Sequence, residues 1–228
     1  MAAARKIQRK KLKQQDEFYG YSLKMLNWIL RNWRYALAGL AFFLAVVFIV
    51  WGINTYLDSQ INKSVAKYYQ AINLYNQADS NSAKLMEARA IFQQIKKGYS
   101  KDLALQGLLY LGHIDYMEGN FEQAVDNYLE LYRRAGKKQS LKDLAVLGLS
   151  YSYESMKEYS KAISYLHEII NSSESVLTDQ AYLSLARLYE QMDNRDKAIS
   201  IYQDALGKFP QAPWKNVIEA KVELLKNL

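Results

Sequence analysis

The sequence contains no cysteine and only two prolines among its 228 residues. Without cysteine the chain has no disulfide framework and no thiolate to act as a nucleophile or a zinc ligand. Its only histidines, His113 and His167, belong to no zinc-binding pattern, and the chain lacks a Gly-x-Ser-x-Gly elbow, a Walker loop and a Gly-x-Gly-x-x-Gly turn. We therefore expect a protein without enzymatic activity, cofactor, metal or small-molecule substrate.

The positive charge of the chain is confined to its N-terminus. Residues 1–34 hold nine Lys or Arg and two acidic residues, whereas the rest of the chain holds 21 of each sign. The formal net charge of +7 therefore belongs to a short tail. Because nucleic-acid binding requires a basic surface, we do not expect the neutral remainder to bind nucleic acid.

A long apolar run follows the tail. Residues 35–57 contain no charged side chain, and as a helix they would measure about 35 Å, enough to cross a bilayer. Aromatic residues that favour the membrane interface stand near both ends of the run: Trp33, Tyr35, Trp51 and Tyr56. A cleavable signal peptide would have a shorter apolar region than this run, and it would end at a small-residue cleavage site that this run lacks. The sequence therefore predicts an uncleaved transmembrane helix over 35–57.

The tail predicts the orientation of this helix. Excess Lys and Arg before a span keep that end cytoplasmic, which places residues 58–228 across the membrane. Within 18–34, one face of a predicted interfacial helix carries Leu26, Ile29, Leu30 and Trp33. The basic tail either binds anionic lipid, contacts a ribosome or another partner, or acts only as a topology signal.

The remaining sequence contains a helical repeat. Leu111-Gly112, Tyr116, Ala124 and Tyr128 follow the tetratricopeptide pattern of two antiparallel helices, and related spacings recur twice. The alanines of the three second helices, Ala124, Ala162 and Ala198, lie 38 and 36 positions apart. The small side chains of these alanines allow close helix crossings, so Ala162→Arg should be strongly destabilising.

The predicted fold is all-α, with one N-terminal transmembrane helix, a tetratricopeptide-like α-solenoid and a C-terminal capping helix. The domain ranges are a tail (1–34), a span (35–57) and a repeat domain (58–228). Within the repeat domain we expect a degenerate unit, three clear repeats and a cap, over residues 60–97, 105–138, 143–176, 179–212 and 214–228. Asp79-Ser80-Asn81-Ser82 should break the degenerate unit, with Ser82 as a helix cap.

The first helices of stacked repeats line a concave groove, whose side chains are therefore candidates for binding a protein segment. The groove rows include Gln106, Leu144 and Gln180, and the candidates are Leu109, His113, Tyr116, Met117, Leu147, Tyr151, Arg187 and Glu190. Most of the wall is apolar or aromatic, and Arg187 or Glu190 would orient the ligand. Leu109, Leu147 and Tyr151 stand where chaperone-tail clamps carry Lys and Asn, so acidic chaperone tails are not expected. Many of the 19 tyrosines stand at repeat core positions and are predicted to pack in the core, such as Tyr128, Tyr153, Tyr189 and Tyr202.

The layout resembles the YfgM-like ancillary Sec translocon subunits of bacterial inner membranes. The resemblance is carried by the segment from Ala36 to Tyr75, a span followed by a polar link and a Tyr/Ala-bearing helix, and by the closing helix from Ile218 to Leu228. It implies a non-catalytic adaptor with its repeat domain in the periplasm. Its implied partners are Sec translocon components, a periplasmic chaperone or translocating chains.

Two other functions remain open. The chain could be a structural scaffold that organises another envelope complex through its convex face or by self-association. A eukaryotic organelle receptor would need its repeat domain in the cytosol, which the basic tail disfavours. The predicted location is the bacterial inner membrane, with a single pass and a cytoplasmic N-terminus.

Overall fold

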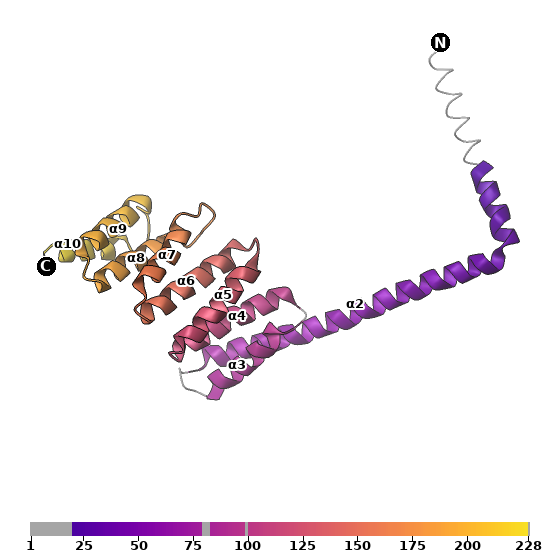
Figure 1. The fold of residues 1–228 in the computed structure, drawn as a ribbon, viewed down its shortest axis with the longest axis horizontal. Helices are drawn as coiled ribbons and strands as arrows, with labels where there is room; N and C mark the ends of the chain where they lie inside the picture. Colours follow the sequence, from indigo (N-terminus) through magenta and orange to yellow (C-terminus); the bar gives the residue numbers. More distant parts are fainter. Residues whose placement is uncertain (1–19, 79–82, 99, 228) are drawn as a thin grey trace, which may run out of the picture. The chain divides into compact units, whose positions relative to one another are not determined.

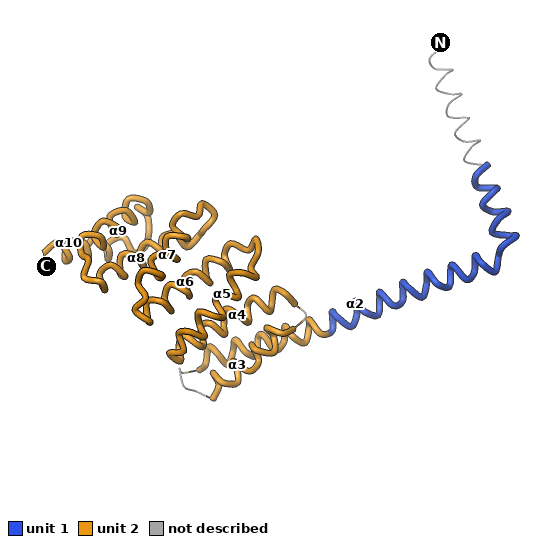
Figure 2. The backbone as a smooth tube through the Cα atoms, viewed as in Figure 1, with its two compact units in different colours: residues 1–59 blue, residues 60–228 orange. Residues whose placement is uncertain are grey.

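The computed structural model describes residues 20–78, 83–98 and 100–227. The chain divides into two compact units, residues 1–59 and 60–228 (Figure 2). All regular secondary structure in the described residues is helical, which confirms the predicted all-α class. The basic residues of the tail before Phe18 and the predicted cap Ser82 lie outside the described residues.

Residues 20–31 are helical, and a turn at Asn32 separates them from the next helix. The helices that follow are labelled in Figure 1. Their bounds are α2 (Trp33–Asn76), α3 (Ala83–Lys96), α4 (Lys101–Met117), α5 (Phe121–Ala135), α6 (Gln139–Ser155), α7 (Tyr159–Ile170), α8 (Thr178–Gln191), α9 (Arg195–Lys208) and α10 (Lys215–Lys226).

Helix α2 is long and apolar enough to cross a membrane. It contains an 18-residue apolar window of which no residue is buried within the protein. The sequence predicts a polar link after Leu57, but the helix continues without a break to Asn76. Residues 58–64 contain neither proline nor glycine, and the Ser64 hydroxyl donates 2.9 Å back to the carbonyl of Gln60 within the same helix. The apolar segment and the first helix of the repeat region are therefore one element.

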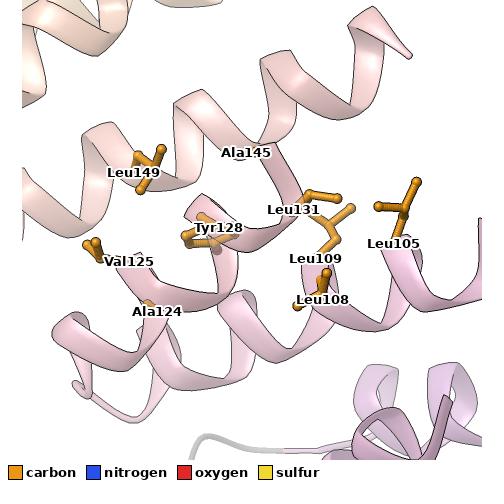
Figure 3. Packing of buried hydrophobic residues seen from close by; sticks show 9 residues of the cluster. All are labelled: Leu105, Leu108, Leu109, Ala124, Val125, Tyr128, Leu131, Ala145 and Leu149. Carbon is orange, nitrogen blue, oxygen red and sulfur yellow. The ribbon is translucent and has the colours of Figure 1, made fainter. Parts of the chain in front are cut away.

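In residues 60–228, successive helices pack against one another as a stack. Four buried apolar clusters each draw residues from three consecutive helices: α2 to α4, α4 to α6, α6 to α8, and α8 to α10. Figure 3 shows the second of these, in which Leu149 and Ala145 of α6 face Tyr128 and Val125 of α5. Each helix pair therefore buries its apolar face only against its neighbours, as repeat proteins do.

The same turn connects the two helices of each clear repeat. Gly119, Lys157 and Asp193 have φ of 78°, 61° and 54°, in the left-handed region. The next residue in each case donates its N–H to the carbonyl five positions earlier, at 2.8, 2.8 and 2.9 Å. This bond ends the first helix and satisfies a carbonyl that the helix leaves free. Lys157 adopts the turn although its sequence is a weak turn signal.

The alanines of the second helices lie at the centre of the stack. Ala124, Ala162 and Ala198 each have 0% exposure. Their positions leave no room for a larger side chain unless the helices separate, which is the physical reason for a small residue at this step of the repeat.

Candidate functional site

A cavity of about 320 Å³ opens between the first helices of the first two clear repeats. We call it the α4–α6 cavity. It is lined by Tyr75 of α2, His113, Tyr116 and Met117 of α4, Tyr128 of α5, Leu144, Leu147, Gly148 and Tyr151 of α6, and Gln180 of α8. A volume of this size is at the lower end of the range of about 300–1,000 Å³ for small-ligand pockets.

Five of the eight predicted groove residues meet at this cavity: His113, Tyr116, Met117, Leu147 and Tyr151. Leu109 does not line it, because this side chain lies in the core cluster of α4 to α6 and is 6% exposed. Arg187 and Glu190 also lie outside the lining.

Arg187 and Glu190 are engaged within the protein. The Arg187 guanidinium forms a two-point ion pair with Glu154 of the preceding repeat, of which the Nη2 to Oε2 distance is 2.7 Å. Glu190 accepts a hydrogen bond from the Tyr202 hydroxyl at 2.5 Å and pairs with Lys221 Nζ at 3.0 Å. These contacts connect α8 to α6, α9 and α10. A ligand would have to compete with them to use either charge.

Two phenol groups at the cavity are already hydrogen-bonded. Tyr116 accepts from Ser155 Oγ at 3.2 Å. The Tyr151 hydroxyl lies 3.1 Å from Ser184 Oγ and accepts from Gln180 Nε2 at 3.3 Å. These bonds run between neighbouring repeats and hold the two rings in place on either side of the opening.

Tyr128 reaches the cavity from the opposite helix layer. Tyr128 belongs to α5, and its ring lies between Gly112 of α4 and Gly148 of α6. A methyl group built on Gly112 would lie 2.5 Å from Tyr128 Cε1, and one built on Gly148 would lie 2.4 Å from Tyr128 Cζ. Both glycines are therefore needed for the ring to fit.

The sequence does not identify Tyr75, Tyr128 or Gly148 as part of the site. The pattern assigns Tyr128 to the core, and the ring is indeed 2% exposed. Gly148 does give a signal, because glycine inside a helix costs roughly 1 kcal/mol and so points to a close approach. Tyr75 carries no signal, since its place at the cavity depends on how α2 packs against α4.

The cavity is electrically neutral. Among the residues that the structure describes, no Asp, Glu, Lys or Arg lines it. Burial lowers the pKa of His113, which keeps the imidazole uncharged near neutral pH. Burial raises the pKa of Tyr75 and of Tyr128, so both phenols keep their protons. Charged ligand groups would lose water here without gaining an opposite charge.

The lining of this cavity carries groups suited to non-covalent binding. No group of three or more His, Cys, Asp or Glu residues in the described ranges could hold a metal ion. The lining offers apolar surface, aromatic rings and a few hydrogen-bonding groups, which is the usual make-up of a recognition pocket.

Solved structures share the repeat architecture. The TPR-like repeats of a Podosopora anserina protein described as a kinesin light chain, and a single-residue variant of the same repeats, each superpose with a TM-score of 0.55 at 13% identity, covering 72% of this chain and 87% of theirs. MamA of AMB-1 gives a TM-score of 0.47 at 16% identity, covering 72% of this chain and 83% of its own. At 13% identity the similarity to the Podosopora anserina repeats concerns the fold alone.

No curated protein sequence matches the chain. The sequence profile of the tetratricopeptide repeat-like domain, however, matches residues 27–227. This match includes all of α2 as well as every helix pair of the stack. The chain therefore belongs to the tetratricopeptide repeat-like domain family.

Proposed function

We propose that the protein is a membrane-anchored adaptor that binds other proteins through the side of the stack formed by α4, α6 and α8. The observation that carries this proposal is the α4–α6 cavity, an apolar and neutral recess lined by the first helices of consecutive repeats. Apolar recesses with a few hydrogen-bonding groups suit extended or helical protein segments. Membership of a repeat family that is typically non-catalytic agrees with a binding role.

The anchor in this proposal is the apolar part of α2. No residue of its 18-residue apolar window is buried, and the basic residues precede it. By the positive-inside rule the tail would lie in the cytoplasm and residues 58–228 on the periplasmic side of the inner membrane. A repeat domain in that position would meet Sec translocon components, periplasmic chaperones or translocating chains, as the resemblance to YfgM-like subunits implies.

A structural scaffold is the second candidate, and the outer face of α10 favours it. Val217 and Leu224, seven positions apart on this last helix, are 68% and 60% exposed. Such an end could join the stack to a fixed assembly partner. The scaffold would use the outer face of α10, whereas the adaptor would use the side formed by α4, α6 and α8.

Site-specific photo-crosslinking in cells separates the two functions. A benzoylphenylalanine at Tyr116 or Tyr151 is expected to capture Sec components, chaperones or secreted chains, because both residues line the cavity. Matched probes at Gln123 on α5 and Ser164 on α7, which are exposed on second helices, should capture much less. Capture of one fixed partner from Val217, with none from Tyr116 or Tyr151, would favour the scaffold and contradict the adaptor.

A further inference from the structure

Tyr128 carries its hydroxyl group to the α4–α6 cavity through a gap between two glycines. Cζ, the ring carbon that bears the hydroxyl, is the Tyr128 atom closest to the Cβ position of Gly148. Gly148 itself lines the cavity, as does Tyr128. The hydroxyl end of the ring is therefore the part that reaches the recess.

No hydrogen bond joins this hydroxyl to another described residue, although the residue as a whole is only 2% exposed. The oxygen is not among the fully buried atoms without a partner, which are Asp143 Oδ2 and Ser150 Oγ, so it stays open to the cavity. Tyr202 stands at the same step of the third clear repeat, four positions after Ala198 as Tyr128 is after Ala124. Tyr202 is equally buried, but its hydroxyl donates to Glu190 at 2.5 Å. Of these two equivalent tyrosines, Tyr128 is the one whose hydroxyl is unpaired.

The surroundings of the hydroxyl limit the chemistry of its ligand. Because the cavity has no charged lining residue, an ionised carboxylate or ammonium group would be desolvated there without compensation. The phenol keeps its proton, since burial raises its pKa, so it is available as a donor. The acceptor that fits is a neutral oxygen, and the backbone carbonyl of a peptide is the one that every protein partner supplies.

We propose that Tyr128 is a specificity-determining donor: its hydroxyl binds a backbone carbonyl oxygen of an extended partner segment that places one uncharged apolar side chain in the α4–α6 cavity. The inference rests on the proposed protein-binding function and narrows it to one kind of segment. A cavity of about 320 Å³ has room for one large side chain. Its apolar contacts would come from Leu144, Leu147 and Tyr151.

Host peptides of the form Ac-Ser-Gly-Xaa-Gly-Ser-NH2 test this proposal on the full chain in lipid nanodiscs. The readout is the NMR shift of isotope-labelled leucine methyl groups, because Leu144 and Leu147 line the cavity. Peptides with Leu or Phe as Xaa should shift these methyl signals. Peptides with Lys or Glu should bind at least about tenfold more weakly, because they would bury an unpaired charge.

Tyr128→Phe removes the hydroxyl and keeps the ring. It should lower the affinity for the Leu peptide by about three- to tenfold, which is the effect of one net hydrogen bond. It should not lower the thermal midpoint of the protein. The matched control is Tyr202→Phe, which should keep the affinity but lower the midpoint, because it leaves Glu190 with one partner fewer. Unchanged affinity in Tyr128→Phe, or a loss of stability as large as in Tyr202→Phe, would overturn the proposal.

A failure of this inference is distinguishable from a failure of the adaptor function. If no host peptide shifts Leu144 or Leu147, the cavity does not take an apolar side chain and the inference is wrong. The adaptor function would still stand if photo-crosslinking from Tyr116 captured envelope proteins in cells. If the peptides bind but crosslinking from Tyr116 and Tyr151 captures nothing, the cavity assignment holds and the adaptor function fails.

Discussion

Gly148→Ala is expected to destabilise the protein by about 2–3 kcal/mol, measured as the free energy of unfolding in denaturant. The added methyl group would lie 2.4 Å from Tyr128 Cζ. The ring cannot move toward α4, because it already lies so close to Gly112 that a Cβ there would be 2.5 Å from Tyr128 Cε1. The helices α4 and α6 must therefore separate, and the apolar cluster between them loses contacts.

Gly207→Ala is the matched control. Gly207 lies in α9, and apart from its chain neighbours and the nearby backbone of its own helix nothing lies within 4 Å of its Cβ position. Alanine there should therefore stabilise the helix by up to about 1 kcal/mol. Tyr128→Leu, which shortens the side chain, should recover part of the loss caused by Gly148→Ala. Equal denaturation midpoints for Gly148→Ala and the wild type would contradict the assigned packing of Tyr128.

Ala162→Arg should cost about 3–5 kcal/mol, the usual effect of leaving a buried charge unpaired. Ala162 of α7 is 0% exposed and belongs to the apolar cluster of α6 to α8, together with Leu166 and Leu185. A guanidinium at this point would both separate the helices and lose its water. We expect a large fall in the thermal midpoint or loss of the folded protein.

Ala90→Arg on α3 gives the comparison, because Ala90 is exposed and a surface substitution of this kind usually changes stability by less than about 0.5 kcal/mol. An Ala162→Arg protein that melts at the same temperature as Ala90→Arg would show that α7 does not cross its neighbours at Ala162.

The fold class could be predicted because its signals are local. The spacing of Ala124, Ala162 and Ala198 reports a repeat, and the long uncharged run reports an apolar helix. The continuity of α2 across 58–64 could not be predicted from polarity, since polar residues without proline or glycine tolerate a helix. The family match and the helical structure confirm the all-α repeat class.

The site was only partly predictable, because side-chain partners depend on contacts between distant residues. Groove positions follow from the repeat pattern, and five candidates do meet at the cavity. The pattern cannot show that Arg187 is paired with Glu154, 33 positions away. Nor can it separate Tyr128 from Tyr202, which occupy equivalent steps but differ in whether their hydroxyls are bonded.

The proposed adaptor function depends on which side of the membrane carries the repeat domain, and single-cysteine labelling tests this most directly. The chain has no cysteine of its own, so Ser160→Cys, exposed on α7, and Gln14→Cys in the tail each provide one unique thiol. In spheroplasts with an intact inner membrane, a membrane-impermeant maleimide should label Ser160→Cys and should label Gln14→Cys only after lysis. Labelling of Gln14→Cys in intact spheroplasts, with Ser160→Cys protected until lysis, would contradict the account.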